Sequence, residues 1–237
     1  MNDKLYKDKN KGFLVGQRYI LIIYYCNQTM KLVPFDQTFQ QEDDSCYAVA
    51  MKVVLDKIAT AYNKPELKIS VHRLNNILGY KRGWGVIGDG VLGLNRLYDA
   101  YLKKNGYTIK RADIAGVDLK KLVSILNNNN FSPPIVSVDE KYYMEHNKGY
   151  RVSEVQTIDV QHQLVINDIN TSTDEIEIFD PDAPRIRKYN KNMGSNGLIK
   201  IAINNFLEYW EGTQRDTIWI AKGNETPLLD SGQKMLG

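Results

Sequence analysis

Downstream of residue 45, apolar residues recur every three or four positions, the spacing of one face of a helix. Asp43, Asp44 and Ser45 precede this pattern and are residue types that favour a helix start. Shorter helices are predicted over 68–80, from the glycine-rich stretch to Lys104, and over 118–130. The apolar face of the first helix contains Cys46, Val49, Ala50, Val53, Val54 and Ala61. We therefore expect Cys46 in the first turn of a long buried helix.

After residue 130 the pattern changes to short apolar runs and alternation, which are typical of strands. Strands are predicted over 135–138, 155–169, 175–180, 198–203 and 216–222, and the apolar run 19–26 is interpreted as an earlier buried strand. This order predicts an α+β domain with two lobes. We expect one catalytic domain over 34–222, with a helical lobe at about 34–130 and a sheet lobe at about 131–222. Residues 1–33 then form an N-terminal extension with one strand, and 223–237 form a polar tail.

Composition narrows the class of protein. The 237 residues are 43% hydrophobic and 25% charged, as in globular proteins, and the net charge of +3 gives no argument for nucleic acid or a membrane surface. Two cysteines and three histidines exclude a disulfide framework and leave little room for metal chemistry, so we expect no metal and no cofactor. No apolar run approaches the roughly 20 residues of a membrane-spanning helix, and no cleavage site of small residues follows 19–26. A cytoplasmic location is expected.

Four residues form the constellation that carries chemistry: Gln40, Cys46, His162 and Asp180. A cysteine nucleophile needs its thiolate stabilised, which unpaired N–H groups at a helix N-terminus provide. It also needs donors for a developing oxyanion, and a Gln side chain six residues upstream can reach there beside the Cys backbone N–H. An imidazole acts as the base, and a third group orients that ring.

His162 and Asp180 are expected to meet across an antiparallel hairpin. The segment around His162 alternates with Leu164 and Ile166 on the histidine's face, and the segment ending at Asp180 alternates with Ile176 and Ile178 on its face. A fold about residue 171 places 166 opposite 176, 164 opposite 178, and 162 opposite 180. Side chains directly opposite each other lie about 5 Å apart at Cβ, which suits an imidazole–carboxylate hydrogen bond. A slip of one residue would separate the two groups onto opposite faces.

These motifs resemble those of the papain-like cysteine peptidase superfamily, and in particular the soluble relatives of the bacteriocin-leader (double-glycine) processing peptidases. The matching pieces, in order, are Gln40 to Cys46, PPIVSV at 133–138, HQLVI at 162–166, Asp180-Pro181, and Phe206 to Trp210 with a final strand. The resemblance covers about 31–222 and implies a papain-like fold with the site in a groove between the lobes. It implies that Cys46 is the nucleophile, His162 the base, Asp180 its orienting group and Gln40 the oxyanion donor.

The sequence also departs from that family. Tyr47 stands where a small residue is usual after the Cys, and would narrow the groove. No membrane region of a transporter follows, so a leader-peptide exporter is not expected. Three acidic residues at 42–44 would oppose the helix dipole unless they point outward, and Gln37 and Gln41 compete with Gln40 for the oxyanion role. The stretch with Gly83, Trp84 and Gly85 lacks the Lys-Ser/Thr of a phosphate loop and is interpreted as a turn or as a wall of the substrate groove.

The primary hypothesis is a cysteine-dependent amide hydrolase, a peptidase or isopeptidase acting on a peptide or protein through a thioester. Two alternatives stay open. An acyl or peptidyl transferase, or a glutamine deamidase toxin, would share the chemistry up to the thioester. A non-catalytic binding module would keep the fold with Cys46 as an inert buried cysteine. A metal site of His162, Asp180 and Asp182 is a further alternative, although it lacks a recognised ligand spacing.

Overall fold

The helix expected to begin at Cys46 is α2 (Cys46–Ala61) in the computed structural model. The structure describes residues 45–81, 85–86, 90–112, 116–146, 161–187, 190–223 and 228–229. Most of α2 is buried, from Tyr47 to Ala59, because its apolar residues extend beyond one stripe. The expected start is confirmed at Ser45, whose side chain makes no cap hydrogen bond with the helix. The strand expected at 19–26 lies outside the described residues.

The remaining predicted helices are present in shorter form. The Ser70 hydroxyl caps α3 (Val71–Leu78) by accepting a hydrogen bond from the N–H of Arg73, and Gly79 ends it with a φ of 83°. The next stretch is α4 (Val91–Leu97), continued by a π turn, η2 (Tyr98–Leu102), and a 3-10 turn, η3 (Lys103–Asn105), up to Gly106. Asp118 caps α5 (Leu119–Leu126). A short 3-10 turn, η1 (Pro65–Leu67), lies between α2 and α3.

One sheet of seven strands crosses the molecule in the order β7-β6-β5-β4-β8-β3-β9. Neighbouring strands are antiparallel except β9, which is parallel to β3. The strands are β3 (Tyr107–Ala112), β4 (Ile135–Asp139), β5 (Gln161–Asn170), β6 (Glu175–Phe179), β7 (Leu198–Ala202), β8 (Thr217–Lys222) and β9 (Leu228–Leu229). A separate two-stranded ribbon joins β1 (Tyr80–Lys81) to β2 (Gly85–Val86). The expected α+β class is confirmed.

Several elements were not predicted. β3 lies inside the expected helical lobe, in the segment between two predicted helices, and pairs along its full length with β8. Two helices, α6 (Glu140–His146) and α8 (Ile203–Glu211), and a one-turn helix, α7 (Ala183–Ile186), interrupt the half expected to consist of strands. β9 falls within the segment expected to be a tail. The lobe boundaries stay a prediction. The seven-stranded sheet nevertheless contains β3 from the expected helical lobe together with strands of the expected sheet lobe.

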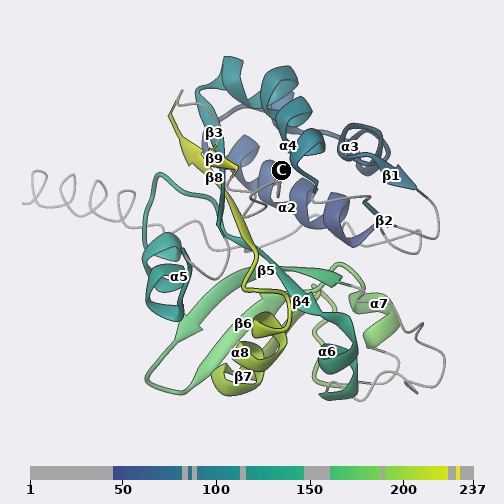
Figure 1. The fold of residues 1–237 in the computed structure, drawn as a ribbon, viewed down its shortest axis with the longest axis vertical. Helices are drawn as coiled ribbons and strands as arrows, with labels where there is room; N and C mark the ends of the chain where they lie inside the picture. Colours follow the sequence, from purple (N-terminus) through teal and green to yellow (C-terminus); the bar gives the residue numbers. More distant parts are fainter. Residues whose placement is uncertain are drawn as a thin grey trace, which may run out of the picture.

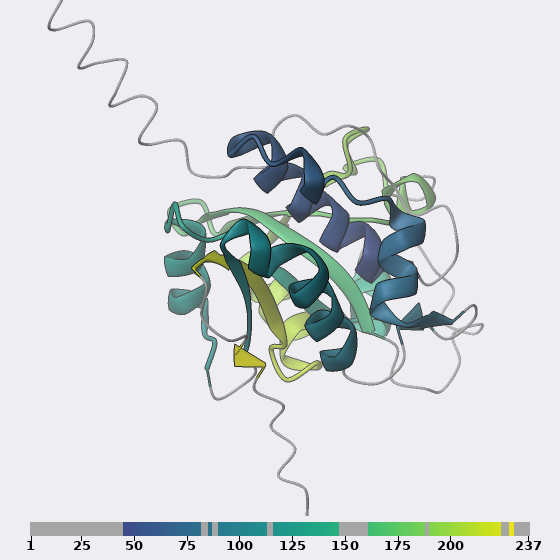
Figure 2. The same cartoon turned by 90° about the horizontal axis from the view of Figure 1, so that it is seen from above.

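The sheet has a hydrophobic cluster on each face. Residues of α2, α3 and α4 pack on one face with Ile135, Val165 and Phe179, whereas α6 and α8 pack on the other with Leu164 and Ile166. Successive residues of β5 therefore point into different clusters, as the alternation of a strand requires. Figure 1 shows α2, α3 and α4 together in the upper part of the molecule, whereas α6 and α8 lie in the lower part beside β4, β6 and β7. Seen from above, α2 runs over β5 (Figure 2).

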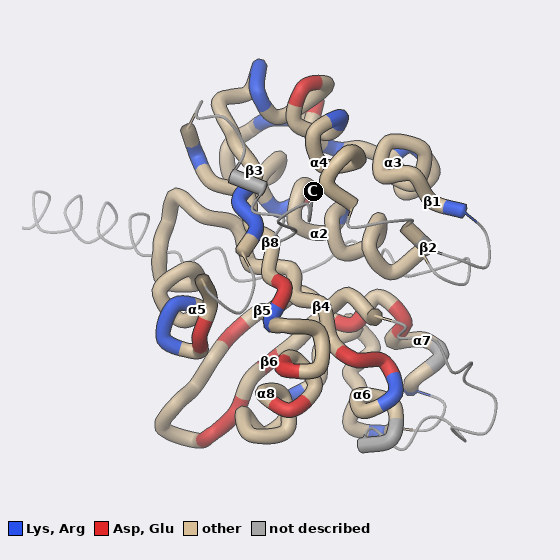
Figure 3. The backbone as a smooth tube through the Cα atoms, in the orientation of Figure 1, with Lys and Arg blue, Asp and Glu red and all other residues tan. Residues whose placement is uncertain are grey.

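Charge is distributed unevenly over this frame. In Figure 3, Lys and Arg positions predominate on β3 and the helices of the upper part, whereas Asp and Glu positions are more frequent in the lower part, on β6, α6 and α8. None of the helices in the described part of the chain is long and apolar enough to cross a membrane.

Candidate active site

Cys46 is the first residue of α2, and its side chain carries a free thiol of intermediate exposure. The backbone N–H groups of the first helical turn have no acceptors within the helix and leave a partial positive charge there. Behind Cys46, α2 is anchored in the core and contacts β5. The sequence thus places a thiol where a helix start can stabilise its anion.

His162 lies near the start of β5 and is almost completely buried, with 3% of its surface exposed. It pairs with Val138 of β4 across the sheet. Its Nε2 is 2.8 Å from Oδ1 of Asp180, and the thiol of Cys46 lies close enough to the ring to raise the pKa of the imidazole. Since Nε2 is taken by Asp180, Nδ1 is the nitrogen left for the thiol. The imidazole therefore contacts both predicted partners.

Asp180 follows the last residue of β6 and has no exposed surface. Its Oδ1 accepts from His162 and from the backbone N–H of Asp182, the latter at 2.7 Å. Its Oδ2 accepts from the hydroxyl of Tyr143 at 2.5 Å. A carboxylate this deeply buried is costly unless its oxygens are hydrogen-bonded, and here each oxygen has a donor.

The predicted contact between His162 and Asp180 is present, but the predicted register of the hairpin is wrong. Ile166 lies opposite Ile178 instead of 176, and Asn170 opposite Glu175 closes a turn over 171–174. A bulge between Ile166 and Asp168 shifts the pairing further along the strands. Near the site the error is two residues, so the histidine and the aspartate stay on one face and meet diagonally rather than directly opposite each other.

Burial and the ion pair act in opposite directions on His162. Burial lowers the pKa of the ring, but the charge and hydrogen bond of Asp180, together with the contact to Cys46, outweigh it and hold the pKa well above its ordinary value of 6.5. Burial likewise raises the pKa of Asp180, while His162, Tyr143 and the Asp182 N–H lower it, and the net pKa is below the ordinary 3.8. The geometry thus favours an imidazolium beside a carboxylate over two neutral groups.

Tyr143 on α6 was not among the predicted site residues. Its ring stacks on the imidazole of His162 with centroids 5.7 Å apart and planes 26° apart, and its side chain is fully buried. Nothing in the sequence around it has a spacing that relates it to His162 or Asp180, since α6 itself was not predicted. Burial raises the pKa of Tyr143 well above 10, and the charge of the neighbouring Asp180 adds to this effect.

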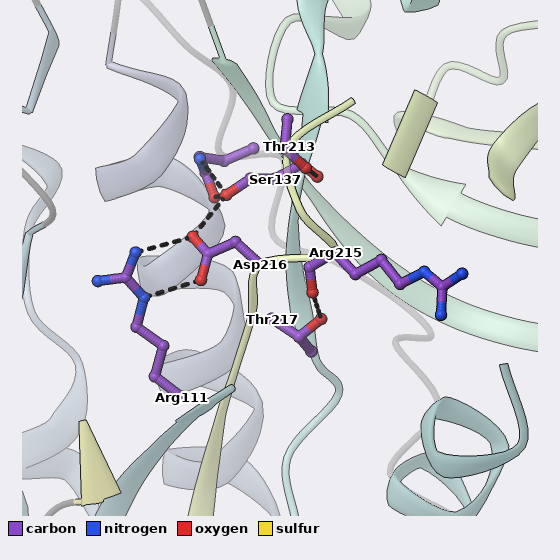
Figure 4. Close-up of polar contacts among 7 residues, drawn as sticks. Arg111, Ser137, Thr213, Arg215, Asp216 and Thr217 are labelled. Atoms are coloured by element: carbon purple, nitrogen blue, oxygen red, sulfur yellow. Dashed lines mark hydrogen bonds and ion pairs between the residues drawn. The ribbon is translucent and has the colours of Figure 1, made fainter. Parts of the chain in front are cut away.

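A second polar network lies on the other side of β5 from His162. The side-chain amide of Gln163 donates a hydrogen bond to the hydroxyl of Ser137 on β4 at 2.9 Å, and that hydroxyl donates to Asp216 at 3.0 Å. Asp216 in turn accepts two hydrogen bonds from Arg111 on β3, at 2.8 and 3.2 Å (Figure 4). The hydroxyl of Thr213 donates to the carbonyl of Ser137. This network ties the strand that carries His162 to β4, β3 and the turn before β8.

The predicted substrate-binding residues are only partly within the described chain. Tyr47 is 7% exposed, and its ring lies against Gly90, where an added Cβ would approach Cε1 to 3.3 Å. Gly85 belongs to β2, which contacts α2. Gln40, Gly83 and Trp84 lie outside the described residues, so their roles stay predictions. Within the described part of the chain, no cluster of three or more His, Cys, Asp or Glu residues could hold a metal ion.

Comparison with solved structures shows the kind of fold. The chain is similar to a structure described as a "putative C39-like peptidase from Bacillus anthracis", with a TM-score of 0.50 and 14% sequence identity. The match covers 81% of this chain and 96% of that one. At this identity the likeness shows the fold alone, an α+β fold of the papain-like peptidase type. No family model and no curated protein matches the sequence.

Proposed function

We propose that this protein is a cysteine-dependent amide hydrolase, a peptidase or isopeptidase. The observation that carries the proposal is the position of the His162 ring, which lies near the thiol of Cys46 and forms a hydrogen bond with the carboxylate of Asp180. A nucleophile, a base and an orienting group in contact are the minimal apparatus for acyl transfer. The peptidase-type fold supports the same reading.

In the proposed acylation, His162 takes the proton of the Cys46 thiol, and the sulfur attacks the carbonyl carbon of the substrate amide. The resulting oxyanion accepts hydrogen bonds from the backbone N–H of Cys46 and from the side-chain amide of Gln40. His162 then gives its proton to the leaving nitrogen, and the C–N bond breaks to leave a thioester and a free amine.

In the proposed deacylation, His162 takes a proton from water, and the hydroxide formed attacks the thioester carbonyl. The C–S bond breaks, a carboxylic acid leaves, and the proton returns to the sulfur or is lost to solvent. Asp180 stays ionised throughout, keeps Nε2 protonated and so presents Nδ1 to the reacting atoms. The electrostatics favour this role, since the pKa of Asp180 lies below its ordinary value.

The proposed substrate is a peptide or protein whose chain passes Tyr47 and the glycine-rich stretch with Gly83, Trp84 and Gly85. The contact between Gly90 and the Tyr47 ring supports this, because it brings the end of that stretch next to the residue after Cys46. The cytoplasmic location stays a prediction from the sequence.

The test uses a peptide mixture from a digested bacterial lysate, read by mass spectrometry, with and without an added primary amine. Wild-type protein should produce peptides with new termini. Cys46→Ala and His162→Ala should lose about a thousandfold or more of that rate. His72→Ala is the matched control, since His72 is exposed on α3. Equal cleavage by Cys46→Ala would refute the proposal. Products joined to the amine would instead indicate a transferase, and conversion of Gln to Glu a deamidase.

A further inference from the structure

The phenol of Tyr143 touches both members of the His162–Asp180 pair. Its hydroxyl donates to Oδ2 of Asp180 at 2.5 Å, and its ring lies nearly parallel to the imidazole at 5.7 Å between centroids. The other carboxylate oxygen takes Nε2 of His162 and the N–H of Asp182. The two oxygens of Asp180 therefore have different partners. Oδ1 binds His162, and Oδ2 binds the hydroxyl of Tyr143.

Tyr143 is itself held firmly. It lies on α6, which begins directly after β4, the strand that pairs Val138 with His162. The ring is fully buried and meets the ring of Tyr209 on α8 edge to face, with centroids 5.8 Å apart and planes 80° apart. Tyr209 packs edge to face with the phenol ring, and the imidazole of His162 stacks on it. This close packing holds the ring of Tyr143 in one orientation in the core.

We propose that Tyr143 is a positioning residue of the active site, which fixes the Asp180 carboxylate through its hydroxyl and backs the His162 ring through its face, so that the imidazole stays turned toward Cys46. The inference deepens the proposed function and rests on it for its catalytic meaning. The contact between Tyr143, Asp180 and His162 can nevertheless be tested without any substrate.

The charge distribution gives the hydroxyl a second effect. The ionisable groups that face Tyr143 are Asp180, Asp182, Tyr209 and, across the ring, His162. Burial and these acidic neighbours raise the pKa of the Tyr143 phenol well above 10. The hydroxyl therefore stays protonated near neutral pH and remains a hydrogen-bond donor. A donor on Oδ2 draws carboxylate charge away from His162. Tyr143 thus moderates how tightly Asp180 holds the imidazolium, and an imidazolium held too tightly is a poor acid for the leaving amine.

The experiment is a pH titration of the histidine ring nitrogens by NMR on ¹⁵N-histidine-labelled protein. The chain has only three histidines, and the spectrum of His162→Gln identifies the His162 signals by their loss. In Tyr143→Phe the ring stays and the hydroxyl is lost. The Asp180 carboxylate then interacts more strongly with the imidazolium, so the titration midpoint of His162 should move up. Placing 3-fluorotyrosine at position 143 strengthens the donor, and the midpoint should move down. Tyr142→Phe, an exposed neighbour on α6, should leave it unchanged.

Opposite shifts for the two changes at position 143 are the signature of a hydrogen bond to the carboxylate. A loss of packing alone would move the midpoint of Tyr143→Phe down, toward that of an ordinary histidine. The proposal is overturned if that midpoint stays or falls, or, should Tyr143→Phe fail to fold by circular dichroism, if the fluorinated residue leaves the midpoint unmoved. Failure of the proposed function would give a different result. Iodoacetamide would then label Cys46 at the same rate in wild type and in His162→Ala, whereas the NMR shifts would persist.

Discussion

At the scale of single residues, the central feature is an ion pair formed almost entirely out of contact with water. Side chains of His162 and Asp180 are 4% and 0% exposed, and desolvation opposes the charged form of each. The pair remains favourable because Asp180 collects three donors and His162 gains the thiol contact. Buried pairs of this kind contribute little net stability compared with apolar packing, but breaking one partner is expensive. A catalytic role of the kind proposed above gives a reason for keeping such a pair.

Asp180→Asn should reduce the free energy of unfolding by about 3 kcal/mol, because it leaves a buried histidine without its counter-charge. The loss should depend on pH. The lowered pKa of Asp180 adds stability above 3.8 that disappears as pH falls through the folded value. The raised pKa of His162 adds stability that is complete below 6.5 and disappears as pH rises through the folded value.

The difference between wild type and Asp180→Asn should accordingly be greatest between pH 3.8 and 6.5 and shrink on both sides. Urea unfolding at a series of pH values measures it. A difference that does not vary with pH would mean that the two residues are not an ion pair in the folded protein.

The sequence was sufficient to predict the contact of His162 with Asp180 but not the register that makes it. The alternation of apolar residues determines which face each side chain takes, and that information survives a two-residue error. The bulge after Ile166 and the left-handed turn residue Asp174, with a φ of 55°, have no comparably clear pattern. Tyr143 was missed because its contact depends on how α6 docks against the sheet.

At the scale of elements, α3 and α4 approach so closely that one position tolerates no side chain. A Cβ on Gly93 of α4 would lie 2.7 Å from Cα and 2.8 Å from the carbonyl oxygen of Leu78. These are backbone atoms, which can yield only if the helices move apart. The close crossing contributes to the support of α2, which packs against α3 in the same cluster.

Gly93→Ala should therefore destabilise the protein by about 2 kcal/mol, although Ala is the better helix former by about 1 kcal/mol. Leu92→Ala at the neighbouring position, which is 77% exposed, should change stability by less than about 0.5 kcal/mol. Thermal unfolding followed by circular dichroism compares the two. A Gly93→Ala protein as stable as wild type would contradict the close approach of α3 and α4.

The turn from α8 into β8 is a strained connection held by side chains. Gln214 and Arg215 have φ values of 57° and 55°, in the left-handed region that costs energy for residues other than glycine. Asp216 follows them and binds Arg111 and Ser137, while the hydroxyl of Thr213 before them donates to the carbonyl of Ser137 (Figure 4). These bonds offset the strain and hold β8 against β3 and β4.

Asp216→Asn should lower the free energy of unfolding by about 2 kcal/mol, because it weakens hydrogen bonds to the Arg111 guanidinium, which is 16% exposed. Glu175→Gln is the matched control. Its partner Lys200 is 3.7 Å away, and the side chains of Lys200 and Glu175 are 61% and 43% exposed, so the effect should be close to zero. Equal losses in the two variants, measured by urea unfolding, would show that the Arg111 network contributes no more than a surface pair.

Elements with strong periodicity were predictable and those defined by tertiary context were not. The spacing of apolar residues located α2 to its first residue, and alternation located β5, β6, β7 and β8. β3 was missed because Lys110 and Arg111 make it polar, and the salt bridge to Asp216 that accommodates Arg111 is formed with a residue far along the chain. In α8, Ile203, Phe206 and Trp210 do follow helical spacing, but Ile203 was assigned to the strand predicted over 198–203, and Phe206 to Trp210 were used only as a motif of the resemblance.

At the scale of the whole molecule, the site lies where two independently packed clusters share one sheet. The thiol comes from α2 in the cluster on one face, whereas Tyr143 and the neighbours of His162 on β5 belong to the cluster on the other. Strand β5 contributes to both, so it is the element that fixes the thiol relative to the imidazole. Changes in either core are therefore expected to reach the site through β5.

The most direct test of this account is the pH dependence of iodoacetamide labelling of Cys46 in wild type and in His162→Ala. If the imidazole of His162 activates the thiol, iodoacetamide labels Cys46 faster in wild type than in His162→Ala, and the two pH profiles differ. His72→Ala should leave the curve in place. Superimposable curves for wild type and His162→Ala would contradict the central claim that the histidine activates this cysteine.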